Sequence, residues 1–183
     1  MKPRHPGPFF TETQLEGVRA AVGMAEDRVS DFYKLSDSQW FRYRYDVRTL
    51  AELEPEEVVD GPFAQVIRYE ARPADASLGS SAFDFYRICL LDHAILPAVA
   101  ELDRISLRPF LLYLVTHELV HVVRFCRFLQ NFNASEEEKR AEEQRVHRRT
   151  LEILERVRIV GMSAVLDFFR DFPARDQPLE VLR

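Results

Sequence analysis

Cysteine is scarce in this chain, which has only Cys89 and Cys126 among its 183 residues. Both lie in apolar stretches, and their spacing fits neither a disulfide framework nor a Cys-x-x-Cys metal site. We therefore expect two buried thiols in the reduced state. The chain must then be held together by an ordinary hydrophobic core, for which its length is sufficient.

Long apolar runs are also missing, since no stretch approaches the roughly eighteen apolar residues that a membrane span requires. The Pro-rich start, MKPRHPGPFFTETQLEG, contains no apolar run of signal-peptide length. Nothing in the chain directs the protein elsewhere, so we expect a soluble, cytoplasmic protein that has no membrane partner.

An excess of positive charge is absent as well, because 25 Lys and Arg stand against 30 Asp and Glu, with a formal net charge of −5. Nucleic-acid binders usually concentrate cations on one face to neutralise phosphates. The basic segment RVHRRT (145–150) closely follows the acidic SEEEKRAEE, so we interpret it as part of a solvated helix face. We expect no nucleic-acid partner.

The remaining composition is that of a globular protein, with 46% hydrophobic and 30% charged residues. A chain of this length fits one domain over residues 1–183, with flexible ends at about 1–10 and 174–183. Periodicity and capping residues predict the elements of this domain. We expect helices over about 11–35, 48–58, 95–105, 106–131, 135–161 and 163–172, and extended segments at 40–45, 63–72 and 83–96.

These elements predict an α+β fold, mainly helical, with a small antiparallel sheet formed by 63–72 and 83–96. Ser135 and Glu138 form a Ser-x-x-Glu capping box at the start of the fifth of these helices. The alternation of aromatic and basic residues at 40–45 is typical of a strand.

The most informative stretch is HELVH at 117–121, in the middle of the apolar helix expected over 106–131. Residues four apart lie on the same face of a helix, so His117 and His121 can direct two imidazoles at one ion. Glu118 lies about 100° further round, where it can reach a water on that ion without binding the ion itself. This His-Glu-x-x-His arrangement is that of zinc hydrolases.

A catalytic zinc needs a third protein ligand and a free position for water. A histidine six residues downstream is excluded, because position 127 is Arg127. The acidic helix after Ser135 offers Glu142 and Glu143, and Glu143 lies nearer the centre of the apolar face of that helix. We therefore prefer Glu143 and leave Glu142 as the alternative. His147, four residues on from Glu143, is either a catalytic group beside the metal or a fourth ligand.

With these residues, the chain resembles the zincin-type metallopeptidases of the gluzincin kind, in their minimal single-domain form. The resemblance covers only about 115–147 and rests on HELVH and on Glu143 with His147. It implies a zinc ion bound by His117, His121 and Glu143, with Glu118 as general base. It also implies a peptide or protein substrate held at an edge strand of a small sheet packed on the zinc-binding helix.

Two other interpretations use the same residues differently. The motif Glu118-x-x-His121 also occurs in di-iron helical bundles, but such proteins need a second copy, which this chain lacks. A non-catalytic zincin-like domain that acts as an interaction or regulatory module remains the alternative to a peptidase. Outside the motif, His93 is expected to be a hydrogen-bonded core or strand-end residue rather than a ligand.

Overall fold

The computed structural model describes residues 7–71, 83–129 and 134–171, which form a mixed α and β structure that is mostly helical, as expected. The predicted ends at 1–6 and 174–183, the segment 73–82 and the predicted stop at Pro173 lie outside the described residues. The elements in chain order are α1 (Glu12–Tyr33), α2 (Asp37–Trp40), β1 (Tyr45–Thr49), η1 (Leu50–Glu52), η2 (Pro55–Glu57), β2 (Ala64–Ala71), β3 (Phe83–Leu90), α3 (Asp92–Glu101), α4 (Leu107–Cys126), α5 (Glu136–Leu154) and α6 (Met162–Asp171).

The sheet has three strands in the order β1-β3-β2, with β3 at the centre. Strands β2 and β3 pair in antiparallel fashion from Ala64 opposite Leu90 to Ala71 opposite Phe83, which confirms the predicted pair. Strand β1 runs parallel to β3, with Tyr45 opposite Tyr86. The expectation of a purely antiparallel sheet was therefore wrong. A parallel partner requires a long connection, which the chain provides through 50–82.

The strand predicted at 40–45 was also wrong, because α2 occupies 37–40 and β1 begins only at Tyr45. Ser36 and Gln39 form a capping box that starts a helical turn. The Trp40 ring then packs edge-on against Tyr43 and Tyr45, with centroids 5.9 and 5.7 Å away. The aromatic alternation therefore reflects this cluster rather than an extended strand.

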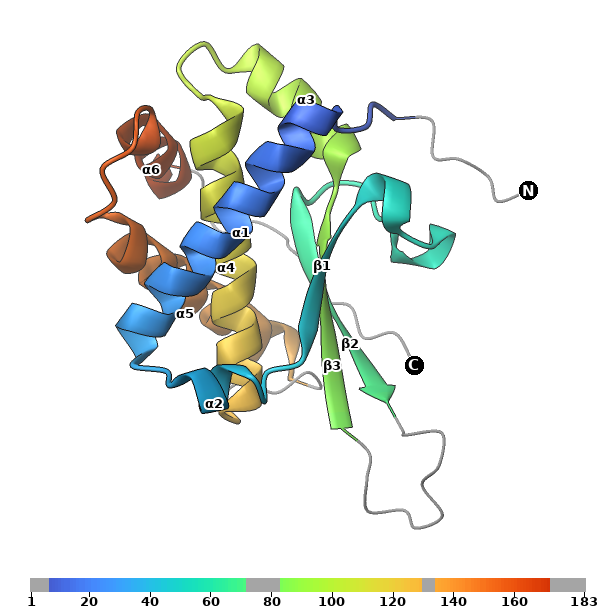
Figure 1. Ribbon diagram of the computed structural model, residues 1–183, viewed down its shortest axis with the longest axis vertical. Helices are drawn as coiled ribbons and strands as arrows, with labels where there is room; N and C mark the ends of the chain where they lie inside the picture. The colour runs from blue at the N-terminus through green and yellow to red at the C-terminus, as the bar shows by residue number, and fades with distance from the viewer. Residues whose placement is uncertain (1–6, 72–82, 130–133, 172–183) are drawn as a thin grey trace.

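Helix α4 is the centre of the molecule, since it contacts α1, α3, α5, α6, β2 and β3. In Figure 1, α1 and α4 lie side by side on one face of the sheet. All residues from Pro109 to Val123 are buried, which explains why the sequence there is apolar except at Thr116 and within HELVH. The helix ends at Cys126, five residues before the predicted Asn131, where Phe128 takes a left-handed φ of 55°.

By length and composition alone α4 could cross a membrane, contrary to the expectation that no stretch would. An 18-residue stretch of this helix has a mean hydropathy of 1.2, and 89% of that stretch is buried inside the protein. A core helix of a soluble protein passes the same test, so the apolar length of α4 is accounted for by its packing.

Capping residues mark where the other two long helices, α1 and α5, begin. Thr11 accepts a hydrogen bond from the Gln14 amide at the start of α1, and Ser135 does the same with Glu138 at the start of α5. Helix α5 ends at Leu154, before the predicted Gly161. Two 3-10 turns, η1 and η2, replace the single helix predicted over 48–58, because Pro55 interrupts it.

Helix α3 begins at Asp92, inside the strand predicted over 83–96, so β3 is shorter than expected. The buried Asp92 carboxylate accepts backbone N–H groups of Phe10 at 2.8 Å and Leu50 at 3.1 Å. This carboxylate ties the segment before α1 and the end of β1 to the start of α3. Phe10, within the end predicted to be flexible, is buried.

Candidate metal centre

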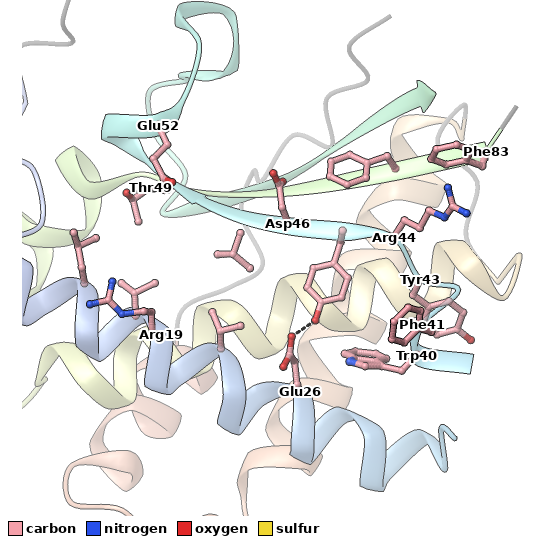
Figure 2. A pocket seen from close by; sticks show the side chains of 16 residues that line it. Arg19, Glu26, Trp40, Phe41, Tyr43, Arg44, Asp46, Thr49, Glu52 and Phe83 are labelled. Carbon is pink, nitrogen blue, oxygen red and sulfur yellow. Dashed lines mark hydrogen bonds between the residues drawn. The ribbon is translucent and has the colours of Figure 1, made fainter. Parts of the chain in front are cut away.

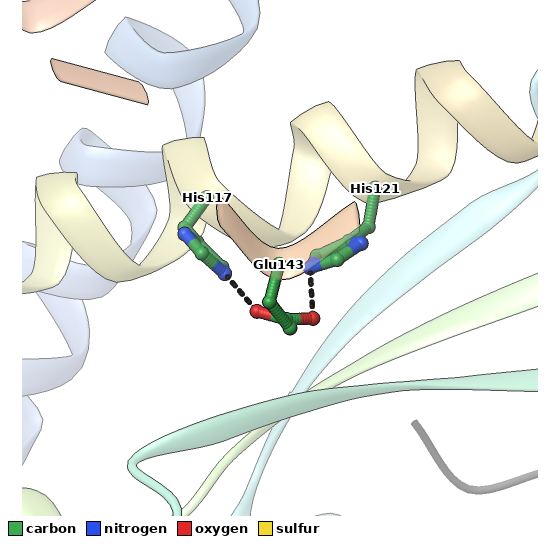
Figure 3. A group of neighbouring side chains, drawn as sticks. All are labelled: His117, His121 and Glu143. Atoms are coloured by element: carbon green, nitrogen blue, oxygen red, sulfur yellow. Dashed lines mark hydrogen bonds and ion pairs between the residues drawn. The ribbon is translucent and has the colours of Figure 1, made fainter. Parts of the chain in front are cut away.

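Helix α4 places His117 and His121 one turn apart on the face that packs against α5, with ring centroids 5.0 Å apart. Helix α5 runs antiparallel to α4 and brings Glu143 between the two rings. The Nε2 atom of His117 lies 3.3 Å from Oε2 of Glu143, and that of His121 lies 2.9 Å from Oε1 (Figure 3). One ligand atom from each of the three residues lies within 4.8 Å of the others.

The centre is almost closed to solvent. His121 is 1% exposed, whereas His117 and Glu143 are 6% and 8% exposed. Burial alone would raise the pKa of Glu143, but the charges and hydrogen bonds of the two imidazoles hold that pKa far below its usual range. Glu143 is therefore an ionised carboxylate that faces two imidazole nitrogens. Together the three side chains form a set of metal-binding groups.

Glu118 lies in the same buried region and is 1% exposed. Burial raises its pKa, while the nearby imidazoles of His117 and His121 act in the opposite direction. Its Oε1 atom has no hydrogen-bond partner among the described residues. Buried polar atoms are normally satisfied, so an orphaned carboxylate oxygen beside the two histidines indicates a further ligand such as water or an ion.

The structure brings Glu143, and not Glu142, to the histidines. Glu142 points to the other side of the contact between α4 and α5, where Arg124 donates to both of its oxygens, to Oε2 at 3.0 Å. Arg145 adds a third contact at 3.1 Å. The carboxylate of Glu142 is therefore engaged in a partly buried ion pair.

His147 lies outside the group of three atoms, one turn further along α5. Its Nδ1 atom shares a hydrogen bond of 2.7 Å with the Tyr113 hydroxyl. Burial lowers the pKa of His147, and the charge of His117 lowers it further. Its position favours a role beside the metal over that of a fourth ligand.

Tyr113 was not singled out from the sequence, although it lies four residues before His117 on the same helix face. Its ring stacks on Phe169 of α6, with centroids 3.6 Å apart, and is itself 2% exposed. The four-residue spacing of Tyr113, His117 and His121 could have indicated from the sequence that Tyr113 lies near the site. His93, by contrast, lies at the start of α3, with Nε2 3.6 Å from Asp60, and is not part of this group.

The donor set fits zinc. Two imidazole nitrogens and one carboxylate oxygen are the three protein ligands of many catalytic zinc sites, which leave one position for water. The Oε1 atom of Glu118, which has no hydrogen-bond partner among the described residues, is left for a water on such an ion. His117, His121 and Glu143 are the residues that would hold the ion.

Two hollows bear on where a substrate could lie. A groove of about 1000 Å³ between α1 and β1 is the larger, and it contains none of the predicted site residues (Figure 2). A second hollow of about 610 Å³ is lined by Glu142 and by Phe125, whose ring stacks on that of His121. Neither hollow is lined by His117, His121 or Glu143, and the stacking on His121 makes the second the more relevant one.

Comparison with family models, curated proteins and solved structures finds no match to this chain. The function is therefore inferred from the geometry of the centre.

Proposed function

We propose that the protein is a zinc-dependent metallopeptidase of the gluzincin kind. The observation that carries this proposal is the position of Glu143, whose two oxygens face the Nε2 atoms of His117 and His121 at 3.3 and 2.9 Å. A glutamate on a following helix that meets both histidines of a His-Glu-x-x-His motif is the ligand arrangement of this class.

Glu118 carries out the proton transfer in this proposal. When bound, zinc lowers the pKa of a water molecule and polarises the substrate carbonyl. Glu118 lies beside both histidines, is fully buried and has an oxygen without a hydrogen-bond partner in the described part of the chain. It accepts the proton of the attacking water and passes it to the leaving amine.

His147 stabilises the negative charge that develops on the substrate oxygen. The Tyr113 hydroxyl engages its Nδ1 atom at 2.7 Å and thereby fixes the orientation of the ring. The other ring nitrogen of His147 is the donor that we assign to the developing oxyanion. Tyr113 acts through His147 and is a positioning residue.

Strand β2 is the edge at which a peptide would be held. It pairs only with β3 within the described sheet and contacts α4, which carries the histidines. The amide of Leu91 donates to the carbonyl of Phe63, so strand alternation directs the backbone groups of Val66 and Arg68 towards the outer edge. An extended peptide paired there would run past the metal centre.

One observation favours the non-catalytic alternative, in which the metal only ties α4 to α5 and the protein acts as an interaction module. Glu118 and His121 are each 1% exposed, and His117 and Glu143 only 6% and 8%, so little of the centre is open to a substrate. A structural site has no need for a base at position 118, which is why we prefer hydrolysis.

The test begins with the zinc content of protein purified without added metal, measured by elemental mass spectrometry. We expect about one zinc ion per chain, retained in Glu142→Ala and lost in Glu143→Ala. Absence of zinc, with none taken up when zinc is supplied, would contradict the proposed site.

Hydrolysis is tested on a mixed peptide library, with products identified by mass spectrometry. Glu118→Gln should keep its zinc but lose at least about 100-fold in rate, because the variant cannot accept a proton. Full activity in that variant would remove the mechanism. Zinc binding without any cleavage by the wild-type protein would leave the interaction module as the function.

A further inference from the structure

The hollow next to Phe125 is lined by six charged side chains and by six that are apolar or aromatic. It lies between the end of α4, the start of α5 and the adjoining ends of β2 and β3, with a volume of about 610 Å³, within the usual range of ligand pockets. We call it the Phe125 pocket and define it by its apolar residues Tyr86, Phe125, Phe128, Leu129, Ala134 and Ala141.

The Phe125 ring lies between the pocket and the proposed metal centre. Phe125 stacks on His121 with centroids 6.1 Å apart, and its ring lies nearly parallel to that of Tyr86, 5.8 Å away. Both Phe125 and Tyr86 are buried and form the floor. A side chain lying on this floor would therefore be separated from the ligand His121 by one aromatic ring.

The charged groups around the Phe125 pocket are compensated by partners in the described part of the protein. Arg68 contacts Asp84 at 2.9 Å, and Lys139 contacts Glu136 at 2.9 Å. Glu142 is held by two arginines, and Glu138 accepts the Ser135 amide at 2.8 Å. A charged ligand group would have to break one of these pairs, so the pocket favours a neutral, apolar group.

Phe128 at the rim indicates that the apolar surface has a use. Its side chain is 93% exposed, and its φ of 55° is a conformation that bulky residues rarely adopt. Helices commonly place glycine at such a C-terminal position. An exposed phenylalanine there is unfavourable both for the backbone and for solvation, and is explained if the ring contacts a bound ligand.

We propose that the Phe125 pocket binds a large apolar side chain, preferably aromatic, of the peptide substrate. This inference rests on the proposed peptidase function. Arg68 of the edge strand β2 also lines the pocket, so a peptide paired with β2 across the metal centre would direct one of its side chains onto the Phe125 floor. The pocket would then select substrates with an apolar residue near the cleaved bond.

The test compares binding of the blocked peptide acetyl-Ala-Ala-Phe-Ala-Ala-amide with versions that have Gly, Lys or Glu in place of Phe. Binding is followed by NMR titration of the metal-free wild-type protein and of the zinc-loaded Glu118→Gln variant, neither of which should cleave the peptide. We expect the Phe peptide to bind at least about tenfold more tightly than the others, because the ring leaves water.

Three variants locate the binding. Ala141→Trp should fill the Phe125 pocket and abolish the preference for Phe, and Phe128→Ala should weaken binding of the Phe peptide several-fold. Phe41→Ala is the matched control, since Phe41 is 91% exposed but lies in the groove between α1 and β1. Circular dichroism and melting temperature confirm that each variant is folded.

The outcomes separate this inference from the proposed function. Phe-selective binding that depends on Phe128 and Ala141, without zinc or cleavage, would support the pocket and remove the peptidase. Cleavage with no preference for apolar residues, or equal effects of Phe128→Ala and Phe41→Ala, would overturn the pocket and leave the peptidase standing. Tighter binding of the Lys or Glu peptide would likewise overturn the pocket.

Discussion

At the scale of single residues, the ion pair between Arg124 and Glu142 stabilises the contact between α4 and α5 next to the candidate metal centre. Glu142 is 4% exposed, and Arg124 donates to both of its oxygens. It is adjacent in sequence to the predicted ligand Glu143 but faces a different partner. Arg124→Met should therefore lower the free energy of unfolding without changing the zinc content of the protein.

We expect Arg124→Met to cost about 2 kcal/mol in urea unfolding, because a buried carboxylate loses its main partner. Arg145 still contacts Glu142, so the loss is smaller than for a fully isolated charge. Arg145→Met is the control and should cost under about 1 kcal/mol, since the Arg145 side chain is 57% exposed. Loss of zinc in Arg124→Met would show that Glu142 takes part in the metal site.

At the scale of helices, replacing glycine with alanine should have opposite effects on stability at Gly17 and Gly161. A Cβ at Gly17 in α1 would meet nothing within 4 Å. Gly17→Ala should raise the free energy of unfolding by about 0.5 to 1 kcal/mol, because alanine favours the helix and restricts the unfolded chain.

Gly161, at the turn between α5 and α6, has a φ of 85°, and a Cβ there would lie 2.9 Å from Oγ of Ser106. Gly161→Ala should destabilise by about 1 to 2 kcal/mol, since it adds a left-handed alanine and a clash at the start of α4. Urea midpoints of the two variants and of wild type, measured side by side, check both signs. A stabilised Gly161→Ala would show that this turn differs from the described conformation.

At the scale of the whole molecule, a bound metal would link α4 to α5 and stabilise the native state. Zinc at about 100 times its dissociation constant adds about 2.7 kcal/mol, which for this chain length raises the melting temperature by about 5 to 10 °C. Removal of zinc with a chelator should reverse the rise, and renewed addition of zinc should restore it.

His117→Ala is the control for this thermal measurement. It should melt at one temperature with or without chelator, because it lacks a ligand of the proposed site. A chelator effect of the same size in His117→Ala would place the stabilising metal elsewhere in the protein.

Much of the fold and of the candidate site could be predicted because the signals are local. Helix periodicity and capping residues located α1, α4 and α5, and the one-turn spacing of His117 and His121 follows from helix geometry alone. The antiparallel pair β2 and β3 followed from two aromatic and β-branched runs that are close in sequence. These features depend on neighbours within a few residues, so the sequence by itself determined them.

Contacts between distant residues were decided only by the tertiary structure. Glu142 and Glu143 lie 100° apart on one helix, and the packing of α5 on α4 selects which of them meets the histidines. The parallel pairing of β1, the contact between Tyr113 and His147 and the Phe125 pocket likewise join segments far apart in the chain. No local pattern encodes them, because each depends on how whole elements pack together.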